Sequence, residues 1–152
     1  MDLWVGSAAD RGASGDMYID GSADKVPQLP EVERAGWSVV WRVAGSFRGC
    51  YGTFTGMQTS ARAEVYALLM AIHCGAPPLT VYTDHQANVR IWEAGKDLYL
   101  ANPMRPNMDL WVEIWRELES FGDFSLRWVK GHARRRDDET WEEEQQREGN
   151  HQ

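Results

Sequence analysis

Three acidic residues stand where strands and helices of the expected fold begin or end: Asp20, Glu64 and Asp84. Asp20 follows an apolar run and precedes the small residues Gly21 and Ser22. Each acid also has a local explanation, because Asp and Ser form turns, Glu complements a helix dipole near its N-terminus, and Asp caps helices. If the three carboxylates converge, however, their oxygens form a ligand set that suits a hard divalent cation such as Mg²⁺. Gly21 would then keep the backbone clear beside Asp20.

The segments that must position these acids alternate between strand and helix patterns. Runs rich in β-branched and aromatic residues predict strands at 16–21, 36–45, 47–56, 79–84 and 124–131. Gly45 and Ser46 separate the second and third runs and predict a hairpin. Asp20 and Asp84 therefore belong to strands that are distant in sequence.

Helical spacing of apolar residues predicts helices at 60–75, 85–95 and 107–121. The first begins behind Thr59 or Ser60 as N-cap, carries Glu64 in its first turn, and stops near Gly75. Asn107 caps the third. The predicted buried faces of the first and third helices are Val65, Leu68, Leu69 and Ile72, and Leu110, Trp111, Ile114, Trp115 and Leu118.

This order of elements predicts an α/β fold in which a mixed sheet is flanked by helices. In such sheets ligands bind where strand ends open a crevice. The 152 residues, 43% of them hydrophobic, suit one domain with one core. We expect loops at 1–15 and 23–35, and another that contains Pro103 and Pro106.

The composition excludes several classes of protein. No apolar stretch approaches the length of a membrane span, and the N-terminus lacks the apolar segment of a signal peptide, so we expect an intracellular, most simply cytoplasmic, protein without a membrane partner. Cys50 and Cys74 lack metal-ligand spacing and are expected to be small buried apolar residues rather than a bridge. The net charge is −7, but residues 137–148 hold seven acids against one base, so the remainder is nearly neutral.

Five motifs occur together in an order that resembles type 1 ribonuclease H, including the related domains of reverse transcriptases. They are "YIDGSA", "QTSARAEVYALLMAI", "VYTDHQANV", "NMDLW" and "LRWVKGHA", and the match runs from about residue 16 to residue 133. The resemblance implies a ribonuclease H-like fold with a five-stranded mixed sheet, three antiparallel strands first and then parallel ones. It also implies a metal-dependent endonuclease that cleaves the RNA strand of RNA–DNA hybrids.

By the same resemblance Asp20, Glu64 and Asp84 are catalytic acids that bind Mg²⁺ or Mn²⁺, two ions per site. Two such ions can orient the attacking water, stabilise the added charge on phosphorus and neutralise the leaving oxygen. His132 matches a family histidine that assists proton transfer or product departure, although an isolated histidine on a loop is more often simply solvated.

The resemblance also suggests which residues contact the hybrid substrate. Gly21 and Ser22 belong to the first motif, and Thr59, Arg62 and Gln86 match positions that line the hybrid groove. Ser60 and Ala61 stand where amide side chains are frequent, so recognition of 2′-hydroxyls would be altered.

Two features depart from the family pattern near the C-terminus. A fourth acid of the family would fall just past Gln152, and we expect it beyond that residue; Asn150 or an acid of the tail are the alternatives. Residues 134–148 form a charged insertion, which is either a solvated loop or a segment in which Arg134, Arg135 and Arg136 touch phosphates. If the fourth acid is absent, a catalytically impaired hybrid-binding module becomes the alternative function, and an integrase-like enzyme is a second one.

The segment before "NMDLW" carries few basic residues, with Lys96 and Arg105 set against Glu93 and Asp97. Affinity for a polyanion rises with the number of phosphates neutralised. We therefore expect modest binding on its own and a tethering partner, such as a polymerase or another nucleic-acid-binding domain.

Overall fold

The computed structural model describes residues 13–26, 29–54, 56–102 and 104–130, and for 24–26 and 29–34 it describes the backbone alone. The elements run in the order β1 (Ala13–Val26), β2 (Leu29–Val43), β3 (Ser46–Gly52), α1 (Ser60–Cys74), β4 (Gly75–Thr83), α2 (Gln86–Ala94), α3 (Lys96–Leu100), α4 (Met108–Leu118) and β5 (Phe124–Trp128).

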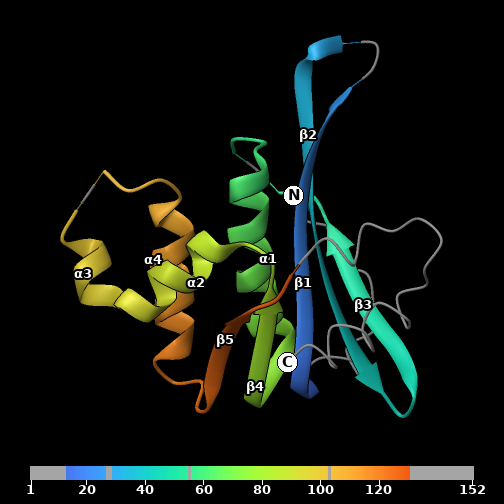
Figure 1. Cartoon of the computed structure of the whole chain (residues 1–152), viewed down its shortest axis with the longest axis vertical. Helices are drawn as coiled ribbons and strands as arrows, with labels where there is room; N and C mark the ends of the chain where they lie inside the picture. The colour runs from blue at the N-terminus through green and yellow to red at the C-terminus, as the bar shows by residue number, and fades with distance from the viewer. Residues whose placement is uncertain (1–12, 27–28, 55, 103, 131–152) are drawn as a thin grey trace.

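The five strands form one mixed sheet in the order β3-β2-β1-β4-β5. β1 pairs antiparallel with β2, which pairs antiparallel with β3, whereas β4 runs parallel to both β1 and β5. In Figure 1 the helices lie to one side of β1 and β2, and α1 runs between these strands and α4. The mixed sheet flanked by helices that the sequence predicts is confirmed.

Alternating residues of the sheet bury one face against α1. Met17 and Ile19 of β1 are buried together with Trp37, Val39 and Trp41 of β2, while the residues between them are less buried. This period of two matches a sheet whose covered face is apolar. β4 differs, because Val81, Tyr82 and Thr83 are buried in succession, as expected of a parallel strand near the centre of the sheet.

Helix α1 is buried on most of its circumference because it lies between the sheet and α4. The predicted core positions of α1 and α4 are confirmed: Val65, Leu68, Leu69, Ile72, Leu110, Trp111, Ile114 and Trp115 are buried, and Leu118 packs against the same core. The Thr59 hydroxyl caps α1 by accepting a hydrogen bond from the Arg62 amide at 3.1 Å. The packing of α1 and its cap at Thr59 together fix where the helix starts, and with it the position of Glu64.

The predicted hairpin between β2 and β3 is confirmed, with its turn one residue earlier. The strands join through Ala44 and Gly45, which both have positive φ, 50° and 83°. Such a two-residue turn matches the twist of the flanking strands.

The expected loops at 1–15 and 23–35 are wrong where the structure describes them. β1 begins at Ala13, and the paired strands continue outward as a long arm (Figure 1), with register pairs such as Ala23 with Ala35 and Lys25 with Glu33. Backbone pairing between β1 and β2 holds this arm together. The sequence prediction missed it because it relied on alternating apolar residues, which do not reveal backbone pairing.

The loop expected between Gly95 and Asn107 contains the short helix α3. The side chain of Tyr99 anchors this helix. Its buried ring packs against Trp111 and Trp115, and its hydroxyl donates to the Pro106 carbonyl at 2.9 Å. Asn107 stands at the cap position of α4, but its side chain makes no capping bond and its φ is 60°. Its backbone carbonyl accepts from the amides of Leu110 and Trp111 instead.

The two cysteines are buried and are not joined by a disulfide, as expected, and their thiols lie next to each other. Their Sγ atoms lie 3.4 Å apart, one on β3 and one at the end of α1. Within the described residues no helix combines the length and hydropathy that a membrane span requires.

Candidate functional site

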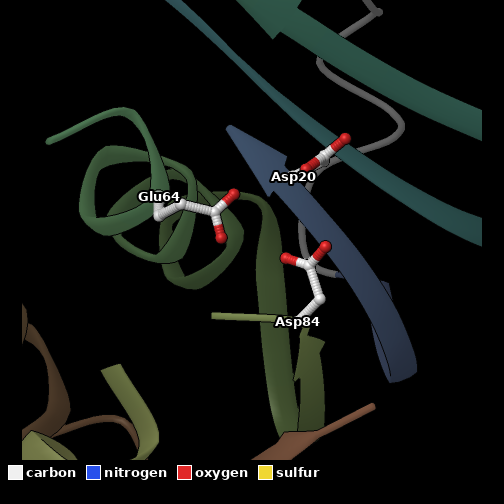
Figure 2. Close-up of side chains that lie close together, drawn as sticks. All are labelled: Asp20, Glu64 and Asp84. Carbon is white, nitrogen blue, oxygen red and sulfur yellow. The ribbon is translucent and has the colours of Figure 1, made fainter. Parts of the chain in front are cut away.

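The parallel pairing of β1 with β4 brings Asp20 and Asp84 to the same edge of the sheet. Tyr18 is in register with Tyr82, and each aspartate follows two residues later along its chain. Asp20 lies within β1, whereas Asp84 comes directly after β4. Both side chains are half-buried. Figure 2 shows the two carboxylates directed toward a common space.

Glu64 reaches this space from α1 because Gly21 lets the helix approach β1 very closely. A Cβ atom at position 21 would lie 2.5 Å from the backbone of Ala63 and Glu64. The Gly21 amide donates a hydrogen bond to Oε1 of Glu64, and the Thr83 hydroxyl faces Oε2 at 3.5 Å. Glu64 is only 4% exposed, so its carboxylate depends on these donors.

The position of Glu64 within α1 corrects the sequence prediction. Because Thr59 caps the helix, α1 begins at Ser60 and its first turn holds no acidic residue. Glu64 lies one turn further along, where a favourable interaction with the helix dipole is weaker. The structure therefore does not support the helix dipole as the reason for this acid.

One oxygen from each of Asp20, Glu64 and Asp84 lies within 4.8 Å of the others. The three residues come from β1, α1 and the end of β4, and Figure 2 shows them around one point. Carboxylate oxygens are the ligands that hard divalent cations prefer, and two of the three side chains remain partly open. The donor set therefore fits a divalent ion such as Mg²⁺ or Mn²⁺.

The local explanation for Asp84 was that it caps the following helix. The structure does not support this explanation. His85 occupies the cap position of α2, and its amide donates to the Thr83 hydroxyl at 3.1 Å. Burial lowers the pKa of the His85 imidazole, and the Asp84 carboxylate opposes part of that effect. Thr83 was not among the predicted site residues; its signal in the sequence is a hydroxyl residue directly before Asp84 at the end of an apolar strand.

The predicted substrate contacts lie within a few residues of the three acids along the chain. Ser22 is exposed beyond Asp20 on β1, and Ser60 is exposed at the start of α1. Gln86 begins α2, and its Oε1 accepts from the Arg90 guanidinium at 3.3 Å. Gly21 packs against α1, as described above. Their roles in binding a substrate stay predictions.

Arg62, which was expected to line the hybrid groove, is paired with Asp109 in the structure, and its role in substrate binding stays a prediction. Its guanidinium forms two hydrogen bonds with the Asp109 carboxylate, at 3.0 and 2.7 Å, and its side chain is only 14% exposed. A third bond, at 3.4 Å, reaches Oδ1 of Asn107. Arg62 thus joins the beginnings of α1 and α4. This contact gives a structural reason for the motifs "QTSARAEVYALLMAI" and "NMDLW" to occur together.

The remaining sequence predictions lie outside the described residues. They concern His132, the charged insertion at 134–148, and Asn150 with the expected fourth acid.

A family model and a curated relative that match this chain belong to the same kind of protein. The family model described as RNase H matches residues 13–147. A protein of Saccharopolyspora erythraea named ribonuclease H is 30% identical over 128 residues, which cover 78% of this chain and 79% of that protein.

Solved structures share the fold. The RNase H domain of prototype foamy virus superposes with a TM-score of 0.60 at 21% identity and covers 94% of both chains. A foamy viral protease-reverse transcriptase in complex with an RNA/DNA hybrid gives a TM-score of 0.62 at 18% identity, over 78% of this chain and 17% of that one.

Proposed function

Because the chain belongs to the RNase H family, we propose that it hydrolyses the RNA strand of RNA–DNA hybrids. The single observation that carries this proposal is the convergence of the Asp20, Glu64 and Asp84 carboxylates within 4.8 Å. The alternative of an integrase-like enzyme is less well supported, since the family model and the curated relative are both of the RNase H type.

We propose that these three residues hold divalent ions, Mg²⁺ or Mn²⁺, with two ions per site. Bound there, such ions would lower the pKa of a water molecule and offset the charge that develops on the scissile phosphate. The protein itself holds the ligand side chains in place. Gly21 and Thr83 hold the buried Glu64 carboxylate in one orientation, and the half-buried Asp20 and Asp84 leave room for the phosphate.

The substrate would lie across the beginnings of α1 and α2. Ser22, Thr59, Ser60 and Gln86 are the proposed contacts, with Gly21 keeping β1 close beneath them. Arg62 is a further proposed contact, and its bond with Asp109 also holds α1 in place. His132 remains the proposed group for proton transfer or product departure.

We also propose that a nucleic-acid-binding or polymerase partner holds this domain on its substrate. Support comes from the foamy viral protein above, in which the matched region is a small part of a longer chain that binds an RNA/DNA hybrid. The intracellular location, the single domain over residues 1–152 and the acid beyond Gln152 stay predictions.

A cleavage assay tests the proposed function. End-labelled RNA–DNA hybrid, double-stranded RNA and double-stranded DNA of one sequence are incubated with the wild-type chain in Mg²⁺ or Mn²⁺, beside Asp20→Asn. We expect internal cuts in the RNA of the hybrid alone, and a loss of at least about 100-fold in Asp20→Asn because a metal ligand is removed. Equal inactivity of both proteins would favour the hybrid-binding module, and cleavage of DNA would favour the integrase-like alternative.

A further inference from the structure

Gln58 has no part in the proposed chemistry, yet all the hydrogen-bonding groups of its side-chain amide are used. Its Oε1 accepts from the Ala35 amide at 3.1 Å, and its Nε2 donates to the carbonyls of Phe54 at 2.8 Å and Gly56 at 3.1 Å. A glutamine amide offers two donors and one acceptor oxygen to its neighbours. These contacts join β2 to the connection between β3 and α1.

The Gln58 amide continues the sheet where β3 has ended. The β2–β3 register stops at the pair of Trp37 with Gly52, two residues short of Ala35. Ala35 is only 4% exposed, so its amide requires a partner there. A second side chain anchors the same connection, since the Trp37 indole donates to the Thr53 carbonyl at 3.2 Å.

The tie ends directly beside the residues that are proposed to touch the substrate. Thr59 follows Gln58 and caps α1, and its amide donates to the Met57 carbonyl at 3.1 Å. Gly56, which Gln58 holds, adopts φ of 99° and lies so close to Arg62 that a Cβ atom there would be 3.0 Å from Nε. The amide of Gln58 thereby fixes the turn that presents Thr59 and Ser60.

Glu64 is positioned by other contacts. Its carboxylate is held by the Gly21 amide, and α1 is buried against β1 at Ala63 and Glu64. Loss of the Gln58 tie should therefore disturb the turn before α1 more than the acidic cluster.

We propose that Gln58 is a positioning residue for substrate binding: its amide ties β2 to the carbonyls of Phe54 and Gly56 and so orients Thr59 and Ser60 toward the RNA–DNA hybrid. This inference rests on the proposed function. A contact surface that is fixed before binding loses less conformational freedom when the ligand arrives, so the tie contributes to affinity rather than to the chemical step.

The test compares Gln58→Met, which keeps the length of the side chain and removes its amide, with Asn102→Ala. Asn102 accepts a comparable bond from the Met104 amide at 3.1 Å in an exposed loop outside the acidic cluster. The readouts are the Kd for an RNA–DNA hybrid by fluorescence anisotropy in Ca²⁺, the KM and kcat for cleavage in Mg²⁺, and thermal unfolding.

We expect Gln58→Met to raise Kd and KM about tenfold, with kcat within about twofold of the wild-type value, because only the prearranged contact surface is lost. Asn102→Ala should change neither. A lower stability or kcat with unchanged Kd and KM would overturn the inference and assign Gln58 a purely structural role. If Gln58→Met does not fold, hydrogen exchange of the wild-type chain decides, since rapid exchange of the Ala35 amide would mean that the tie does not form.

The two proposals fail in different ways. A wild-type chain that neither binds nor cleaves the hybrid contradicts the proposed function. A wild-type chain that binds the hybrid, with a Kd that Gln58→Met leaves unchanged, contradicts only the role of Gln58.

Discussion

Gly21 illustrates how one missing side chain determines the geometry of the candidate site. The residue after Asp20 lies against the backbone of α1, where a Cβ atom would be 2.5 Å from Ala63 and Glu64. The glycine therefore allows Asp20 and Glu64, which are distant in sequence, to share one point in space. A flexible turn is not its function, because position 21 lies within β1, in register with Trp37.

Replacing Gly21 with alanine should destabilise the fold and separate the acids. The added methyl group meets backbone atoms that cannot rotate away, so we expect a loss of about 3 kcal/mol in the free energy of unfolding. Urea denaturation measures it. Gly36→Ala is the matched control, because its Cβ would meet only the Gly52 carbonyl, at 3.3 Å, and should cost clearly less. Equal losses in the two variants would contradict the close approach at Gly21.

The sequence predicts the identity of the three acids but not the contacts that hold them. Asp20, Glu64 and Asp84 are visible because each lies within a family motif, beside a strand end or helix start that the sequence predicts. The bond from Thr83 and the tie made by Gln58 join segments that the chain separates by long distances. No local pattern encodes such contacts, since they depend on how elements pack rather than on periodicity.

At the level of elements, the site depends on how the beginnings of α1 and α4 are joined. Arg62 and Asp109 form a bidentate pair at 3.0 and 2.7 Å. The hydrogen bond from Arg62 is the main reason that the pKa of the Asp109 carboxyl is lowered, and the same bond raises the pKa of Arg62. α4 therefore supports the helix that carries Glu64, although it contributes no acid to the cluster.

The Arg62–Asp109 pair gives the stability of the chain a defined dependence on pH. Since the folded state lowers the pKa of Asp109, its contribution is present above the pKa of the unfolded state and is lost as pH falls through the lower folded value. We expect Asp109→Asn to be less stable than wild type by about 1 kcal/mol near pH 7, because the carboxylate is largely exposed to solvent. Thermal unfolding between pH 7 and pH 2.5 should show this difference shrinking below about pH 4. A difference that stays constant over the whole range would contradict the pairing.

The sequence predicts the strands and helices correctly wherever one face of the element is apolar. The core positions of α1 and α4 have helical spacing, and the hairpin before β3 has its turn residues. The outward continuation of β1 and β2 was missed because paired backbone groups leave no apolar alternation. α3 was missed because one buried residue, Tyr99, anchors a helix of five residues. Both errors arise from contacts between elements.

For the whole molecule, charge determines how firmly a polyanion can be held. The net charge is −7, and several cations among the described residues already have partners: Arg62 with Asp109, Lys96 with Glu119, and Arg116 with Glu113. Each cation engaged within the protein is less available to neutralise a phosphate. This distribution supports the proposal that a tethered partner supplies part of the affinity for nucleic acid.

The salt dependence of hybrid binding tests that proposal. We expect the logarithm of Kd to change with the logarithm of salt concentration with a slope below about 4, equivalent to few phosphate contacts. Fluorescence anisotropy between 25 and about 200 mM salt gives the slope. A steep dependence, like that of proteins with many phosphate contacts, would mean that the domain holds a hybrid firmly without help.

The most direct test of the central claim is a calorimetric titration of Mn²⁺ into the metal-free wild-type chain, Asp84→Asn and Asp123→Asn. The claim is that Asp20, Glu64 and Asp84 together hold divalent ions. It predicts that Asp84→Asn binds Mn²⁺ at least about tenfold more weakly than wild type, as expected when a ligand is removed. Asp123→Asn, which removes an exposed carboxylate outside the cluster, should bind like wild type. Binding of equal strength in all three proteins would contradict the claim.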